Sequence, residues 1–130
     1  MKVCMVTTGS LNGPGGVENV ALNISKQLEA NGIETISVHA YEKYSNPVIS
    51  VIKFRNVLKK VEKISPDIVH THDTAGYWIA KSSLDYVHTS HGTWKHCFDY
   101  MQQSIKNSLV QRTSDSMLKT VIEGARATAA

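Results

Sequence analysis

The sequence predicts an α/β domain built on a doubly wound parallel sheet with helices on both faces, and three observations support this prediction. Short apolar segments alternate with helical patterns along the chain, as in parallel sheets whose strands are connected through helices. The first apolar segment is continuously hydrophobic, which is typical of a strand buried on both faces. With 130 residues, the chain has the size of one domain with its own core.

Five segments have the composition of strands. The first covers residues 2–8, is rich in apolar and β-branched residues, and leads into a glycine-rich loop. The second covers 33–39 and alternates between apolar and polar residues. Three more strands are expected at 48–53, 67–72 and 86–90.

Helical periodicity separates these strands. Apolar residues at 17–28 recur at intervals of three and four, which places them on one helix face, and an Asn-Gly pair ends the pattern. Further helices are expected at 54–64 and 75–82. The chain is mostly helical in pattern beyond residue 95, and about 104–130 is expected to be a helical tail of uncertain role. Together these elements predict a single Rossmann-like, three-layer α/β/α domain.

Composition excludes several classes of protein. Apolar residues make up 42% of the chain, charged residues 19%, and the net charge is +3, so nothing indicates a nucleic-acid-binding protein. Two cysteines, Cys4 and Cys97, are too few for a disulfide scaffold, so a cytoplasmic location is expected. No segment has the pattern of a signal peptide or the length of a membrane span.

Three polar features follow strands whose carboxyl ends should meet at one edge of the sheet. They are the glycine-rich loop at 9–16, the pair His72-Asp73 and the pair His91-Gly92. Ligands of doubly wound sheets bind at this edge. The loop also precedes a helix N-terminus, where backbone N–H groups favour an anion. It matches neither the dinucleotide fingerprint nor the P-loop, so an anion site and a simple turn both remain open.

Five of the six histidines lie between residues 70 and 96, which raises the alternative of a metal site. A metal-dependent hydrolase could use His70, His72 and His91, but the pattern of binuclear hydrolases is not met. We therefore expect no metal. His70 and His88 are interpreted as half-buried strand residues whose ring nitrogens are paired.

Three motifs in this order resemble the N-terminal domain of the large family of retaining glycosyltransferases with the GT-B fold (glycosyltransferase family 4-like, group 1). They are GGVE at 15–18, DIVHTH at 67–72 and TSHG at 89–92, and the match covers residues 1 to about 100. The resemblance implies that 1–130 is the acceptor-side half of the enzyme and that the nucleotide-sugar domain is absent. The chain would then be a truncated gene product, an expressed domain or one half of a split enzyme, and it would be inactive alone.

The resemblance also implies roles for individual residues. Gly15 and Gly16 match glycines whose backbone N–H groups face the donor diphosphate, and Gly92 lies at the same site. His91 matches the histidine beside the transferred sugar, which makes it the candidate catalytic residue. Three further residues would line the acceptor side of the cleft: Glu18, His72 and Asp73.

The partners that the resemblance implies are a nucleotide sugar, a sugar or lipid-linked acceptor, and a chain carrying the second domain. No cofactor is expected besides the donor substrate. A non-catalytic ligand-binding module with the same fold remains the alternative. The helix expected at 54–64 has a basic face, which fits a solvated surface better than a weak contact with an anionic membrane. Its residues are Arg55, Lys59, Lys60 and Lys63.

Overall fold

A computed structural model describes residues 1–12, 15–40, 47–91 and 108–129. In this part of the chain five strands form one sheet in the order β2-β1-β3-β4-β5, and every neighbouring pair is parallel. The strands are β1 (Lys2–Thr7), β2 (Glu34–His39), β3 (Ile68–His72), β4 (Tyr86–Thr89) and β5 (Ala127–Ala129).

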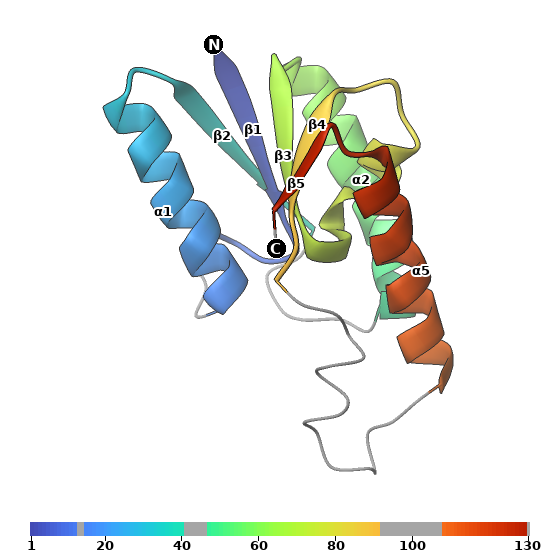
Figure 1. The fold of residues 1–130 in the computed structure, drawn as a ribbon. Coiled ribbons are helices and arrows are strands. Elements are labelled where there is room, and N and C mark those ends of the chain that lie inside the picture. The colour runs from blue at the N-terminus through green and yellow to red at the C-terminus, as the bar shows by residue number, and fades with distance from the viewer. Residues whose placement is uncertain (13–14, 41–46, 92–107, 130) are drawn as a thin grey trace.

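Helices cover both faces of the sheet (Figure 1). On one face α1 packs against β1 and β2, while on the other α2, α3 and α5 contact one another. The helices are α1 (Gly16–Ala30), α2 (Pro47–Ile64), the 3-10 turn η1 (Asp73–Gly76), α3 (Tyr77–Ala80) and α5 (Ser108–Gly124). The fold is therefore the predicted Rossmann-like, three-layer α/β/α arrangement.

The first βαβ unit forms as its sequence pattern predicts. Gly32 ends α1 in the left-handed region with φ of 78°, and its N–H donates to the Glu29 carbonyl at 3.0 Å. The apolar stripe of α1 packs against β1 residues whose side chains point to that face. This cluster contains Val3, Met5, Ala21, Ile24 and Leu28.

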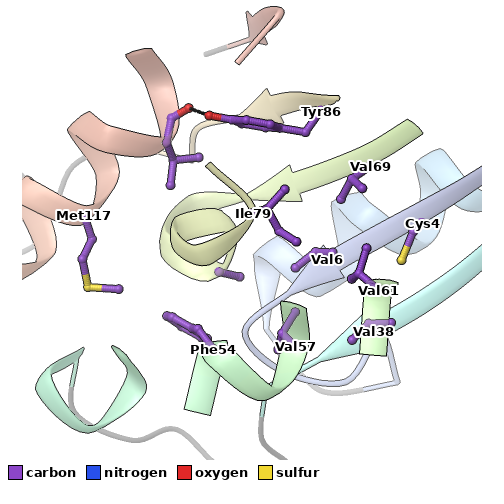
Figure 2. Packing of buried hydrophobic residues seen from close by; sticks show 12 residues of the cluster. Cys4, Val6, Val38, Phe54, Val57, Val61, Val69, Ile79, Tyr86 and Met117 are labelled. Atoms are coloured by element: carbon purple, nitrogen blue, oxygen red, sulfur yellow. Dashed lines mark hydrogen bonds between the residues drawn. The ribbon is translucent and has the colours of Figure 1, made fainter. Parts of the chain in front are cut away.

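The larger core lies on the opposite face of the sheet, between the strands and α2, α3 and α5 (Figure 2). Phe54, Val57 and Val61 share one face of α2 and are each 0–1% exposed. Tyr86 reaches from β4 to α5, where its buried hydroxyl donates to the Val121 carbonyl at 2.6 Å (Figure 2). Since the hydroxyl has this partner, the tyrosine closes the core without an unpaired polar group.

The strand expected at 48–53 is wrong, because this segment is the first half of α2. Its run of β-branched residues favours a strand by intrinsic propensity. However, Pro47 occupies the first helical position, where its missing N–H costs nothing. The buried stripe that follows on α2 then continues the helix, so tertiary packing overrides the local preference.

The helical tail expected at about 104–130 is only partly correct, because the chain returns to the sheet as β5 after α5 ends. Met117 and Val121 of α5 are buried in the main core. Beside the new strand, Arg126 pairs with Asp85 at 3.1 Å. The strand is short and rich in alanine, so its formation depends on pairing with β4 rather than on its own sequence.

Four basic side chains of α2 are exposed to solvent. Arg55 also lies over the ring of Trp78, with 5.7 Å between the guanidinium carbon and the ring centroid. Such exposure is compatible with a solvated face and with a membrane contact alike. The exposed residues are Arg55, Lys59, Lys60 and Lys63. None of the helices that the structure describes is both long and apolar enough to cross a bilayer.

Candidate functional site

Three strands of the sheet end side by side and present polar groups at their carboxyl edge. Strand β1 leads into the glycine-rich loop, the central strand β3 ends at His72, and β4 runs toward His91. In the sheet register His72 lies opposite Thr89, two residues before His91. The parallel topology therefore brings together segments that are far apart in the sequence.

Gly9 and Gly15 of the glycine-rich loop lie close to the carboxylate of Glu18, from the first turn of α1. Glu18 Oε1 accepts hydrogen bonds from the Gly9 N–H at 3.2 Å and from the Thr8 hydroxyl at 3.4 Å. A Cβ at Gly15 would overlap the other carboxylate oxygen, and one at Gly9 would lie 2.9 Å from Oε1. These two glycines thus make room for the acidic side chain.

Gly16 differs from its neighbours in the loop. Apart from its chain neighbours and the adjacent backbone of α1, no atom of the described residues lies within 4 Å of the position that a Gly16 Cβ would occupy. Gly16 is also the first residue of α1, where backbone N–H groups have no partner within the helix. The open space beside Gly16 is therefore compatible with a bound anion.

Three histidines form a row that leads from the middle of β3 to the edge of the sheet. The rings of His70 and His72 stack with their centroids 4.4 Å apart, and those of His72 and His91 lie 5.3 Å apart. His70 is held in place by Thr89, whose hydroxyl oxygen lies 2.8 Å from the His70 Nε2. His72 is fully buried, whereas His91 is only half-buried.

His91 is attached to the end of β3 at two points. Its ring nitrogen Nε2 lies 3.0 Å from Nδ1 of His72. Its backbone N–H donates to the Asp73 carboxylate at 2.9 Å. Asp73 has a φ of 48°, in the left-handed region that few residues other than glycine and asparagine or aspartate adopt readily. With this backbone conformation, the Asp73 carboxylate lies within hydrogen-bonding distance of the His91 N–H.

Burial shifts the acid–base properties of the row. Desolvation, followed by the neighbouring histidines His70, His91 and His88, lowers the pKa of His72 to about 3. Burial, with His91 as the second cause, also lowers the pKa of His70. Both rings are therefore neutral at pH 7.

Burial is also the main cause of the shift at Asp73, whose pKa lies above its ordinary value. The His91 N–H and the His91 charge oppose this rise, while the charge of Glu18 adds to it. The effect of Glu18 agrees with the pairing of β1 and β3, which brings the glycine-rich loop and the end of β3 to the same edge of the sheet.

The structure thus brings together most of the residues that the sequence singles out: Gly15, Glu18, His72, Asp73 and His91. Their assignment to donor or acceptor remains a prediction. Gly92 lies outside the described residues, so its expected donor contact has no structural counterpart here.

The two histidines expected to be half-buried and paired have different outcomes. His70 has its partner in Thr89 and is half-buried, as expected. His88 is 1% exposed, and only its Nδ1 has a partner, the Thr71 hydroxyl oxygen at 3.0 Å. The expectation of a half-buried, fully paired His88 is therefore wrong, because the side chain points into the main core.

His70, His72 and His91 do lie close together, as the hydrolase alternative requires. However, a nitrogen of His72 and a nitrogen of His91 are directed at each other, and His70 is engaged by Thr89. Among the residues that the structure describes, no group of three or more His, Cys, Asp or Glu side chains could hold a metal ion.

Sequence reasoning missed Thr8 as part of the site, and it included Gly9 only as the first residue of the loop, without a role of its own. Both contact the Glu18 carboxylate, and Gly9 has to lack a side chain for that contact to form. A glycine directly after a buried strand, with an acidic residue in the first turn of the next helix, is the signal that could have identified this arrangement.

Comparisons with known proteins identify the family. A family model described as glycosyl transferase 4-like matches residues 17–123. No curated protein matches the chain. Among solved structures, the chain is similar to a crystal structure of a 1,3-propanediol oxidoreductase, with 16% identity and a TM-score of 0.45. That similarity covers 68% of this chain and only 28% of the oxidoreductase, and it carries no argument about function. Because the family model spans most of the sequence, the chain belongs to the glycosyl transferase 4-like family.

Proposed function

We propose that this chain is the acceptor-side, N-terminal half of a glycosyltransferase that moves a sugar from a nucleotide-sugar donor to an acceptor with retention of configuration. The observation that carries the proposal is the convergence of the glycine-rich loop, the end of β3 and His91 at one edge of the sheet. Membership of the family supports the reaction class.

The loop suits the diphosphate of a donor. Gly16 is the first residue of α1, and no described side chain beyond its chain neighbours lies within 4 Å of where its Cβ would be. Backbone N–H groups at a helix N-terminus stabilise the negative charge that grows on a leaving diphosphate. Glu18 occupies the other side of the same loop, so Gly15 and Gly16 have separate tasks: Gly15 accommodates Glu18, and Gly16 approaches the phosphate.

His91 suits a contact with the transferred sugar. His91 is half-buried, so it is shielded from bulk solvent and still accessible to a ligand. Its ring contacts His72, and its backbone N–H donates to Asp73. A ring held in this way loses little conformational entropy when it binds a hydroxyl. In this proposal the donor phosphate takes up the acceptor proton, so no residue of this chain has to act as the base.

We also propose that sugar transfer requires a second domain, because one side of the cleft alone does not enclose a donor and an acceptor. We expect no sugar transfer when the 130-residue chain is incubated with nucleotide sugars and simple acceptors. Weak binding should still perturb backbone resonances at Gly16 and His91 in an NMR titration with uridine and guanosine diphosphate sugars. Measurable transfer would refute the claim of inactivity, and unchanged resonances at both residues would refute the proposed site.

A matched pair of alanine substitutions separates the two proposed roles in the loop. Gly16→Ala adds a Cβ that meets no described atom, so stability should stay constant or rise by up to about 1 kcal/mol, since alanine favours helix over glycine. The same methyl should keep a diphosphate from the backbone and weaken nucleotide-sugar binding roughly tenfold, which is about 1.4 kcal/mol.

Gly15→Ala should instead lower the stability of the fold. Its Cβ displaces the Glu18 carboxylate, and losing the hydrogen bond from Gly9 should lower the free energy of unfolding by about 1 kcal/mol. Calorimetric titration and chemical denaturation of both variants test the pair. Nucleotide-sugar binding by Gly16→Ala at wild-type affinity would exclude Gly16 from the phosphate site.

A further inference from the structure

The contact between His72 and His91 restricts how His91 can meet a ligand. A neutral imidazole has one nitrogen that carries hydrogen and one that accepts. Nε2 of His91 is engaged by Nδ1 of His72, so only Nδ1 of His91 is left for a ligand. Whether that nitrogen donates or accepts depends on which of the two rings supplies the shared hydrogen.

The second ring nitrogen of His72, Nε2, distinguishes the two arrangements. This nitrogen is buried and has no hydrogen-bond partner among the described residues. If His91 supplied the shared hydrogen, His72 would carry its own hydrogen on this buried Nε2, as a donor without an acceptor. Among buried backbone groups, unpaired N–H donors are rarer than under-satisfied acceptors, which indicates that an unpaired donor is the less tolerated of the two. The arrangement in which His72 Nδ1 donates to His91 Nε2 leaves Nε2 of His72 as an unpaired acceptor instead.

His88 provides a second instance of the same pattern. Its Nδ1 also has a partner, Thr71, while its Nε2 is buried without one among the described residues. The Thr71 hydroxyl has the Val87 carbonyl as an acceptor at 3.3 Å, so its oxygen is free to accept from His88. For both buried histidines, the contacts thus favour the tautomer that carries its hydrogen on Nδ1 and none on Nε2.

We infer that His72 and Asp73 are positioning residues for His91: Asp73 anchors the backbone, and His72 keeps the His91 hydrogen on Nδ1, as a donor toward an oxygen atom of the ligand. That the oxygen belongs to a sugar rests on the proposed function. The tautomer itself does not, because it follows from contacts within the chain. A donor at this point selects ligands that offer a hydroxyl, ether or phosphate oxygen, and it disfavours a ligand that can only donate.

The inference is tested on the whole chain by long-range ¹H–¹⁵N NMR of the imidazole rings at about pH 8, above the ordinary pKa of histidine. His91→Gln assigns the His91 signals by their loss. We expect the nitrogen shifts of wild-type His91 to be those of the Nδ1–H form. The Nε2–H form would overturn the inference, whatever the variants show.

Two substitutions of similar size test the dependence on His72. His72→Asn retains an N–H donor near the position of Nδ1, so the Nδ1–H form of His91 should persist. His72→Leu removes the donor, so the signals should shift toward the Nε2–H form or an average of the two forms. An unchanged His91 spectrum in folded His72→Leu would overturn the role of His72. If this variant does not fold, the wild-type and His72→Asn spectra still decide.

The same spectra separate this inference from the proposed function. Addition of a nucleotide sugar should move the His91 Nδ1 resonance and leave its tautomer unchanged. An Nδ1–H form that no nucleotide sugar perturbs would refute the donor site and support the tautomer assignment.

Discussion

Replacement of Phe54 by alanine should lower the free energy of unfolding by roughly 3–5 kcal/mol, the cost of removing a buried aromatic ring from a close-packed core. Phe54 is 1% exposed and is among the largest fully buried side chains that the structure describes. It lies in α2 within the main core, which also includes residues of β1, β3 and α5 (Figure 2). Denaturant unfolding followed by circular dichroism measures the change.

Ile52 provides a matched control two positions earlier on the same helix. Its side chain is 73% exposed, so Ile52→Ala should change stability by less than about 0.5 kcal/mol. A strand at 48–53 would bury alternate residues instead, and Ile52 would share the face of Phe54. Comparable losses in the two variants would therefore contradict the helical assignment of this segment.

Acidification from pH 7.5 to 5.5 should lower the free energy of unfolding by up to roughly 3 kcal/mol, because two buried histidines resist protonation in the folded state. Burial lowers the pKa of His72 to about 3 and, as the largest cause, that of His88 to about 4. Below about pH 6.5 the unfolded chain takes up protons at both positions and the folded chain does not, so unfolding gains about 1.4 kcal/mol per pH unit per group. Their stabilising effect is complete above pH 6.5 and is lost as the pH falls.

The titration of Asp73 has the opposite effect on the pH dependence of stability. Its raised pKa means that the folded chain binds a proton more readily than the unfolded chain, which offsets part of the histidine effect. His88→Asn retains a polar group near Nδ1 and removes one titrating group. Its stability should therefore depend less on pH, by about 1.4 kcal/mol per pH unit below pH 6.5. A wild-type stability that is flat between pH 7.5 and 5.5 would contradict neutral, buried histidines.

The elements that sequence reasoning predicted correctly are those whose signals are local. α1 has an apolar stripe and a glycine at its end, and both act within a few residues. β1 contains a continuous apolar run, and β3 begins with Ile68 and Val69. The rule that parallel strands share a carboxyl edge is enough to predict that His72 lies near the glycine-rich loop.

The elements that it missed depend on distant partners. The β-branched run at 48–53 is helical because the rest of α2 packs into the core, and β5 exists because β4 offers an edge to pair with. Neither partner can be recognised from within the segment. Local propensity is weak enough, at about 1 kcal/mol or less per residue, for packing to reverse it.

For the site, the order of the residues along the chain was enough to predict which chemical groups gather at the edge of the sheet: glycines, Glu18, Asp73 and histidines. Which of these groups contact one another follows only from the three-dimensional arrangement. Gly15 makes room for Glu18 while Gly16 stands open, and His72 and Asp73 hold His91 by its ring and its backbone. The physical reason is that hydrogen bonding and desolvation depend on distances of a few ångströms between strands, whereas sequence order determines only which strands are neighbours.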